Sequence, residues 1–211
     1  MKRILLIVCF MLCTVGCTNI NKMNYKDIVN ETIKKNSNNK IYNRSSKGYK
    51  YYLPKYMSVI DDKDYNEKIS SNKYSYYLFI DIISYYNNSK ITCNNDSYYF
   101  SNNNIEGCLK VNNNNDKYYI EIIYNYAKIE VKVDKEDINN AINNSIIILS
   151  TIKYDRDIID NLIGDNNINS KEENLSIFDN NVSNDNFLDI MEEYDKYEEE
   201  EDVIPDYDII N

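Results

Sequence analysis

Short turns between apolar segments place the strongest constraint on how this chain can fold. Four segments that are apolar or alternate in polarity follow one another between Ser97 and Val133. They are 97–100, 105–111, 118–124 and 127–133, with Asn- and Asp-rich turns at 101–104 and 112–116. Parallel pairing of consecutive strands needs a crossover of about a dozen residues or more. Because no gap is that long, the pattern predicts a meander of antiparallel strands.

The segment Tyr74–Tyr86 has the strongest strand pattern, since it is apolar on both faces and interrupted by Asp81. Such a strand is typical of the middle of a sheet that is covered on both sides. A strand is also predicted at Tyr49–Leu53, before Pro54. Between these two strands, the pattern predicts a short strand or turn at 57–60 and a helical turn within 61–71.

The hydrophobic period changes after Asp134, which is a suitable N-cap with Asp137 three residues later. Helical spacing then relates Ile138, Ala141, Ile142, Ser145, Ile146 and Leu149. This predicts a helix at about 135–149 that packs on the sheet. A last strand at 151–154 and a short helix from Asp155 to Ile163 follow, with Gly164 at C-prime. The predicted class is α+β: an antiparallel β-sheet of about five to seven strands packed by a C-terminal helix.

The order of these elements over residues 48–163 is similar to that of the PsbP-like α/β sandwich found in some secreted lipoproteins. The resemblance implies a sheet-and-helix domain that serves binding and assembly. It rests on element order alone, so it transfers no functional residue to this chain.

The N-terminus has the features of a secretory signal peptide. Lys2 and Arg3 precede the apolar run Ile4–Val15, which is shorter than the roughly 20 residues of a membrane-spanning helix. Thr14-Val15-Gly16-Cys17 then resembles the lipobox of bacterial lipoproteins. The resemblance implies cleavage before Cys17 and lipidation of its sulfur, and two acyl chains would anchor the protein stably. The alternative is an ordinary signal peptide with a chance cysteine.

Four segments are therefore expected: a signal peptide at 1–16, an anchor with a short helix and linker at 17–47, the α+β domain at 48–164, and a tail at 165–211. Within the second segment, Asn24 is a plausible N-cap for an amphipathic helix that ends near Lys35. The tail holds 16 Asp and Glu against Lys171 and Lys196, which predicts an acidic and disordered segment. The rest of the mature chain is near neutral, which argues against a nucleic-acid partner.

Two cysteines, Cys93 and Cys108, lie in the predicted domain. After export they could form a disulfide or remain as two free thiols. A metal site is not expected, because two cysteines in a chain without histidine do not supply enough ligands.

The sequence predicts no catalytic residue and no cofactor. Histidine-based triads and phosphate-binding loops are absent from it. Asp81 is the one acid inside an apolar strand, either as a buried functional group or as a rim residue that could pair with Lys128. An aromatic platform for glycan or peptide is the other candidate site, with Tyr76, Tyr77, Tyr85, Tyr98, Tyr99, Tyr118 and Tyr119. The alternative is a tyrosine-rich core and rim that follow from codon bias.

These features favour a lipoprotein on the extracytoplasmic face of the cell membrane. Membrane lipid, through Cys17, and an envelope protein or wall component are the expected partners. A non-enzymatic binding or scaffold domain is the first hypothesis. A small-ligand or glycan-binding surface lipoprotein is the alternative, and a carboxylate-dependent cell-wall hydrolase that uses Asp81 is a remote one.

Overall fold

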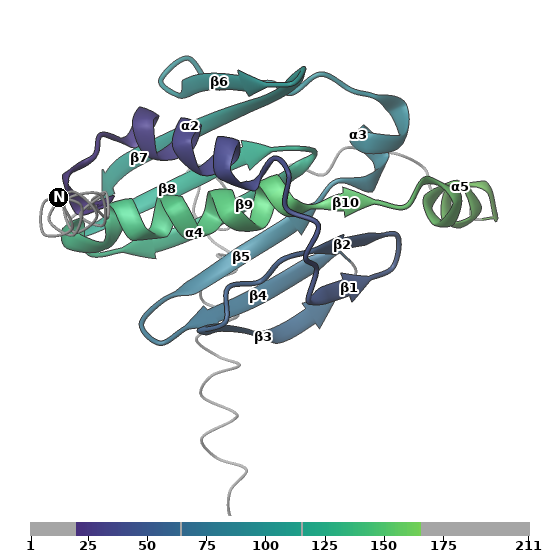
Figure 1. Cartoon of the computed structure of the whole chain (residues 1–211), viewed down its shortest axis with the longest axis horizontal. Coiled ribbons are helices and arrows are strands. Elements are labelled where there is room, and N and C mark those ends of the chain that lie inside the picture. Colours follow the sequence, from purple (N-terminus) through teal and green to yellow (C-terminus); the bar gives the residue numbers. More distant parts are fainter. Residues whose placement is uncertain (1–19, 64, 115, 166–211) are drawn as a thin grey trace, which may run out of the picture. The chain divides into compact units, whose positions relative to one another are not determined.

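The computed structural model describes residues 20–63, 65–114 and 116–165 (Figure 1). All of them lie in the first of two compact units, 1–170, and the second unit, 171–211, lies outside the described residues, as does the predicted tail from 166 onward. The strands are β1 (Arg44–Ser46), β2 (Tyr49–Tyr51), β3 (Met57–Lys63), β4 (Asn66–Ser71), β5 (Ser75–Ile80), β6 (Tyr98–Asn102), β7 (Ile105–Asn114), β8 (Lys117–Tyr124), β9 (Ala127–Val133) and β10 (Lys153–Tyr154). The helices are η1 (Ile20–Lys22), α2 (Tyr25–Asn36), α3 (Ile82–Asn87), η2 (Lys135–Asp137), α4 (Ile138–Thr151) and α5 (Arg156–Asp165).

The strands form a seven-stranded sheet in the order β3-β4-β5-β9-β8-β7-β6 and a three-stranded sheet in the order β1-β2-β10. Every pairing is antiparallel. The predicted meander from β6 to β9 is confirmed, because tight turns join these strands. Asn103, Asn104, Asn125 and Tyr126 adopt the positive φ angles that such turns require. The α+β class is therefore confirmed.

Helix α4 is the predicted packing helix, and it lies across β8 and β9 with α2 beside it (Figure 1). Its apolar positions, among them Ile142, Ile146 and Leu149, are fully buried against the sheet. The start of the helix differs from the prediction. A 3-10 turn comes first, and the Asp134 side chain makes no cap hydrogen bond. Its carboxylate binds lysines and a tyrosine instead.

The predicted strand Tyr74–Tyr86 is wrong in its second half and in its burial. β5 ends at Ile80, and Asp81 begins α3 by accepting a hydrogen bond from the Ser84 backbone N–H at 2.7 Å. Along β5, fully buried residues alternate with half-buried ones, so only one face lies in the core. Asp81 thus lies where the strand ends and the helix begins, because its side chain accepts a hydrogen bond from a free N–H in the first turn of α3.

The helical turn predicted within 61–71 is also wrong, because β3 and β4 pair there as a hairpin with an irregularity between Val59 and Asp61. The predicted strand at 151–154 exists as β10, but it pairs with β2 in the small sheet. Gly164 lies within α5 and not beyond its end.

Helix α2 confirms the predicted amphipathic helix and its cap, since Asn24 Oδ1 accepts from the Asp27 N–H at 2.9 Å. Its position corrects the expectation of a linker before residue 48. Ile28, Val29 and Ile33 lie in the same hydrophobic core as the sheet. The Thr32 hydroxyl also donates to Asn143 Oδ1 of α4 at 2.9 Å. The packed domain therefore includes residues that the sequence assigned to the anchor segment.

Candidate functional site

The predicted lipidation residue, Cys17, lies outside the described residues. The described chain begins three residues later at Ile20, and this point is firmly attached to the domain. Asn139 Nδ2 on α4 donates to the carbonyl oxygens of Ile20 at 2.8 Å and of Met23 at 3.0 Å. The segment that carries Cys17 thus joins the domain beside the start of α4. None of the described helices has the length and apolarity of a membrane span.

Cys93 and Cys108 are joined by a disulfide, with their Cα atoms 5.9 Å apart. Of the two states that the sequence left open, the structure contains the bridge. Cys108 lies on β7 and is 3% exposed, while Cys93 lies in the long connection between α3 and β6. The bridge therefore holds this connection against the sheet.

Asp81 is not buried, although the hypothesis of a functional carboxyl group required it to be. It is exposed at the start of α3 and serves as the helix cap. Among the ion pairs of the described residues, none joins Asp81 to Lys128, whose ammonium lies 2.6 Å from Glu130 Oε1. The residue thus has a structural role as the N-cap of α3.

The seven tyrosines of the predicted platform do not share one surface. Tyr77, Tyr99 and Tyr119 lie on the sheet face away from α4, in register with Glu130, Cys108 and Lys132 respectively. Tyr76 is 2% exposed, and its hydroxyl lies 3.5 Å from Asn144 of α4. Three more lie elsewhere: Tyr85 on α3, Tyr98 beside α2, and Tyr118 on the α4 side of β8.

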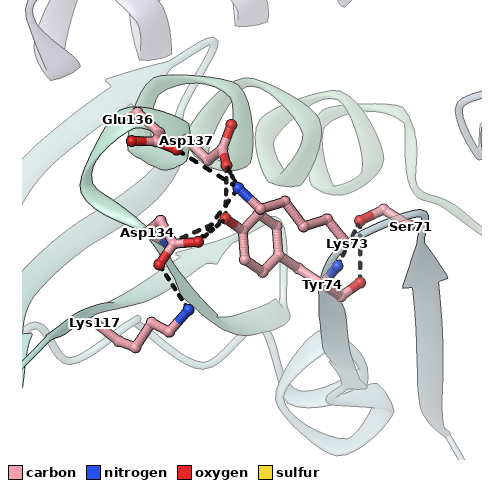
Figure 2. A network of polar contacts seen from close by, with 7 residues as sticks. All are labelled: Ser71, Lys73, Tyr74, Lys117, Asp134, Glu136 and Asp137. Carbon is pink, nitrogen blue, oxygen red and sulfur yellow. Dashed lines mark hydrogen bonds and ion pairs between the residues drawn. The ribbon is translucent and has the colours of Figure 1, made fainter.

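A polar network lies at the start of α4, where side chains from three elements meet (Figure 2). The Tyr74 hydroxyl lies 2.8 Å from Asp134 Oδ2 and 2.6 Å from Asp137 Oδ2. The Lys73 ammonium donates to Asp137 at 2.6 Å, and the Lys117 ammonium donates to Asp134 at 2.6 Å. The network therefore ties the starts of β5 and β8 to the turn before α4.

The charges in this network stabilise one another. Hydrogen bonds from Lys117, Tyr74 and Lys73 lower the pKa of Asp134 to about 2. The Lys73 ammonium, and after it the Tyr74 hydroxyl, lowers the pKa of Asp137. The hydrogen bond to Asp137 contributes most to raising the pKa of Lys73. Each group is held in its ordinary charge state, so the network is suited to fixing structure rather than to moving a proton.

Glu67 is a buried acid that the sequence analysis missed. It lies on β4, is 2% exposed and accepts from the hydroxyls of Tyr49 at 2.6 Å and Tyr51 at 2.5 Å. Arg44 Nε lies 3.5 Å from the same carboxylate. Burial, reinforced by the carboxylate, raises the pKa of both tyrosines well above the ordinary value. The cluster joins the small sheet to the large one.

A second buried acid, Glu130 of β9, lies on the face away from α4, directly opposite Glu121 of β8. Like charges in such a cross-strand pair destabilise a sheet, and the Lys128 ammonium offsets this repulsion. The Tyr119 hydroxyl donates to Glu121 at 3.2 Å. Among the described residues, His, Cys, Asp and Glu side chains form no group of three that could hold a metal ion.

Helix α2 is flanked by two grooves, and these are the candidate binding sites. One, of about 350 Å³, lies against α4 and has apolar walls that include Ile20, Met23 and Ile147. The other, of about 390 Å³, lies between α2 and the β6–β7 turn, and its lining residues are polar except for Ile33. Both volumes are at the lower end of the range of about 300–1,000 Å³ for small-molecule sites. No sequence pattern predicts these grooves, because they depend on where α2 packs.

No protein-family model matches the chain, and no curated protein matches it significantly. A partial structural similarity is found to a protein from Bacteroides thetaiotaomicron VPI-5482, whose crystal structure was determined at 1.50 Å resolution. The two sequences are 9% identical, and the TM-score is 0.34. The similarity covers 50% of this chain and 44% of the other. A similarity of this size supports no conclusion on function, and the resemblance to PsbP-like sandwiches stays a prediction.

Proposed function

We propose that this protein is a lipoprotein of the cell envelope, anchored through Cys17, that displays a non-enzymatic binding domain outside the cytoplasmic membrane. The observation that carries the proposal is the lipobox-like sequence Thr14-Val15-Gly16-Cys17 at the end of a short apolar run. A thioether-linked diacylglyceryl group supplies the two chains that stable anchoring requires.

The position of η1 and α2 supports a short tether. Ile20 is already bound to α4, so Cys17 is separated from the packed domain by two residues. An extended chain advances at most about 3.6 Å per residue, which limits the distance between the Cys17 and Ile20 Cα atoms to about 11 Å. The domain would therefore be held close to the lipid headgroups, within reach of an inner wall layer or a membrane-bound partner.

Metabolic labelling with a clickable fatty acid tests the anchor. Wild-type protein should take up the label and stay in the membrane fraction, and Cys17→Ala should do neither. Cys13→Ala is the matched control, since it alters a signal-peptide cysteine and leaves Cys17 in place. Equal labelling of the Cys17→Ala protein and the wild type would refute the proposal.

Cross-linking in intact envelopes tests the binding role. The wild-type protein should capture a protein or wall fragment that is not captured by a control lipoprotein of similar abundance. Full-length protein and a variant that ends at residue 170 should be compared, because the two units of the chain could contribute separately. If neither protein captures an enriched component, the proposed binding role is refuted, even if fatty-acid labelling establishes the anchor.

Small-ligand binding is a second candidate, favoured by the two grooves beside α2. A thermal-shift screen with wall sugars and short wall peptides would detect it. Bound ligand raises the melting temperature by mass action. If no compound shifts the transition, this second function is excluded for the ligands tested.

A further inference from the structure

One face of α2 is directed at the edge strand β6 and the turn that follows it. Lys26, Asn30 and Lys34 recur at intervals of four residues, which places them on one side of the helix. The Lys26 ammonium lies 4.8 Å from the centre of the Tyr98 ring on β6. Asn30 and Lys34 line the groove of about 390 Å³ together with the β6–β7 turn.

The walls of this groove are rich in groups that can form hydrogen bonds. Amides come from Asn30, Asn102 and Asn103, and a hydroxyl comes from Ser101. The Ser37 hydroxyl donates to the Lys34 carbonyl oxygen at 2.9 Å and can still accept. Within the described part of the chain, the three amide side chains make no hydrogen bond to another side chain or to the backbone. Each amide offers two N–H donors and one acceptor oxygen, which suits a ligand with alternating donors and acceptors.

The groove carries a positive charge that the described structure does not neutralise. Lys34 is the one charged residue in its lining, and no described acid forms a salt bridge with it. Glu31, one residue beyond Asn30, lines the opposite groove. A ligand with a negative group is therefore favoured over a neutral one.

The groove is held in shape before any ligand binds. Asn102 pairs with Ile105 at the end of the β6–β7 ladder, and Asn103 and Asn104 form the turn with φ angles of 49° and 65°. On the other side, Ile33 is anchored in the core at 3% exposure. Rigid walls reduce the ordering cost that a ligand must overcome.

We propose that this groove binds an anionic saccharide. The asparagine amides would bind ring hydroxyls and acetamido groups, and the Lys34 ammonium would bind the acidic group. The inference rests on the proposed display of the domain in the cell envelope, where acidic amino sugars occur. To the proposed function, this inference adds the chemical class of the ligand and the place where it binds.

N-acetylmuramic acid and N-acetylglucosamine are suitable probes, because they differ only by the lactyl ether that carries the carboxylate. The full lipid-anchored chain, purified in detergent with isotope-labelled asparagine, would be titrated with each sugar and followed by NMR. Both sugars should shift the side-chain amide signals of Asn30, Asn102 and Asn103. The acidic sugar should bind about fivefold more tightly, as expected for one exposed charge pair.

Two lysine variants separate the groove from general electrostatics. Lys34→Gln should remove the preference for the acidic sugar. Lys35→Gln is the matched control, because it removes the same charge from the same last helical turn but lies beside the other groove. It should keep the fivefold preference.

The inference is overturned if neither sugar shifts these amide signals, if both bind equally well to the wild type, or if the two lysine variants lose the preference equally. Fatty-acid labelling tests the proposed anchor independently of sugar binding. Labelled Cys17 with an unoccupied groove would refute this inference alone.

Discussion

At the scale of single residues, the buried acid Glu67 makes the polar contacts that join the two sheets. Glu67 is removed from water, which is costly for a carboxylate unless its oxygens are paired. The hydroxyls of Tyr49 and Tyr51 satisfy one oxygen each, and Arg44 approaches from the side. The two sheets are thus joined by a buried polar contact, in which β2 supplies the two hydroxyls and β4 supplies the carboxylate.

Replacing this acid should destabilise the whole domain. Glu67→Gln keeps the size of the side chain but offers one acceptor oxygen where two hydroxyls donate, and its amide group faces a donor. Hydrogen bonds to charged groups contribute about 1.5–3 kcal/mol, so we expect a loss of about 2 kcal/mol in urea unfolding. Glu136→Gln is the control, because that side chain is 80% exposed and should change stability by less than about 0.5 kcal/mol. Equal effects would show that the Glu67 cluster contributes nothing specific.

The network at the start of α4 predicts sensitivity to acid. The pKa of Asp134 is about 2 in the folded state and 3.8 when unperturbed. The folded state thus binds fewer protons than the unfolded state between these values, and stability falls as the pH drops from about 4 to 2. Asp134→Asn should be less stable than wild type at neutral pH, and the difference should shrink toward pH 2.

Urea midpoints measured across this pH range would check the Asp134 prediction. Asp116→Asn, at an exposed position outside the network, should follow the wild-type curve with a constant offset. A difference between Asp134→Asn and wild type that stayed constant down to about pH 2 would contradict a role for the ionised carboxylate.

At the scale of elements, the disulfide holds the connection between α3 and β6. Cys93 and Cys108 are separated by 15 residues, and closing a loop of this size stabilises a protein by about 3 kcal/mol in the loop-entropy model. Reductant should therefore lower the free energy of unfolding by about that amount. The double variant Cys93→Ala/Cys108→Ala should give the same unfolding curve with and without reductant. A wild-type curve unchanged by reductant, with the thiols shown to be free, would contradict the prediction.

The cap of α2 tests whether this helix belongs to the cooperative domain. Asn24→Ala removes the hydrogen bond to the Asp27 N–H and should cost about 1 kcal/mol. Because Ile28, Val29 and Ile33 share the core of the sheet, the loss should appear in the single global transition. Asn140→Ala, at an exposed position within α4, should be neutral within about 0.5 kcal/mol. A separate early transition would show that α2 unfolds on its own.

Local patterns were sufficient to predict α2, α4 and the strands from β6 to β9. Asn24 caps α2 through a contact with Asp27, three residues later, and Ile142 and Ile146 follow helical spacing. Apolar and charged residues alternate along β9. The prediction failed where a distant partner decides. Asp61–Ser71 is charged and irregular, and it becomes a hairpin because β4 also pairs with β5. Glu67 looks like a surface acid until the tyrosines of β2 cover it.

The candidate site depended still more on long-range structure. Lys34 and Asn102 are 68 positions apart in the sequence, and only the packing of α2 on α4 brings the helix beside the β6–β7 turn. Nothing in either segment alone suggests a groove. Cys17 is the reverse case, because its proposed role depends on four consecutive residues.

At the scale of the whole domain, the two ends of α4 have different attachments. Ile20, the first described residue after Cys17, is bound near the helix start through Asn139. The helix ends at Thr151, and α5 follows it after β10. A helix of 14 residues is about 21 Å long, so Ile20 and the strand β10 lie near opposite ends of α4. Both grooves lie beside α2, which begins five residues after Ile20.

Tyrosine burial throughout the domain predicts loss of stability in alkali. Burial raises the pKa of Tyr76 and Tyr124 to about 12, against 10.0 for an unperturbed tyrosine. The folded state keeps these protons after the unfolded state has lost them. Their contribution to the stability of the fold is therefore complete below pH 10 and is lost as the pH rises to about 12.

Near-ultraviolet absorbance should show exposed tyrosines ionising first and the buried ones ionising together with unfolding. Tyr124→Phe should lessen the alkaline decline, because the variant has no hydroxyl to ionise at this buried position. Tyr42→Phe, before β1, is the substitution control and should decline like wild type. Ionisation of all tyrosines in one step near pH 10, with the fold intact, would contradict the burial on which the core depends.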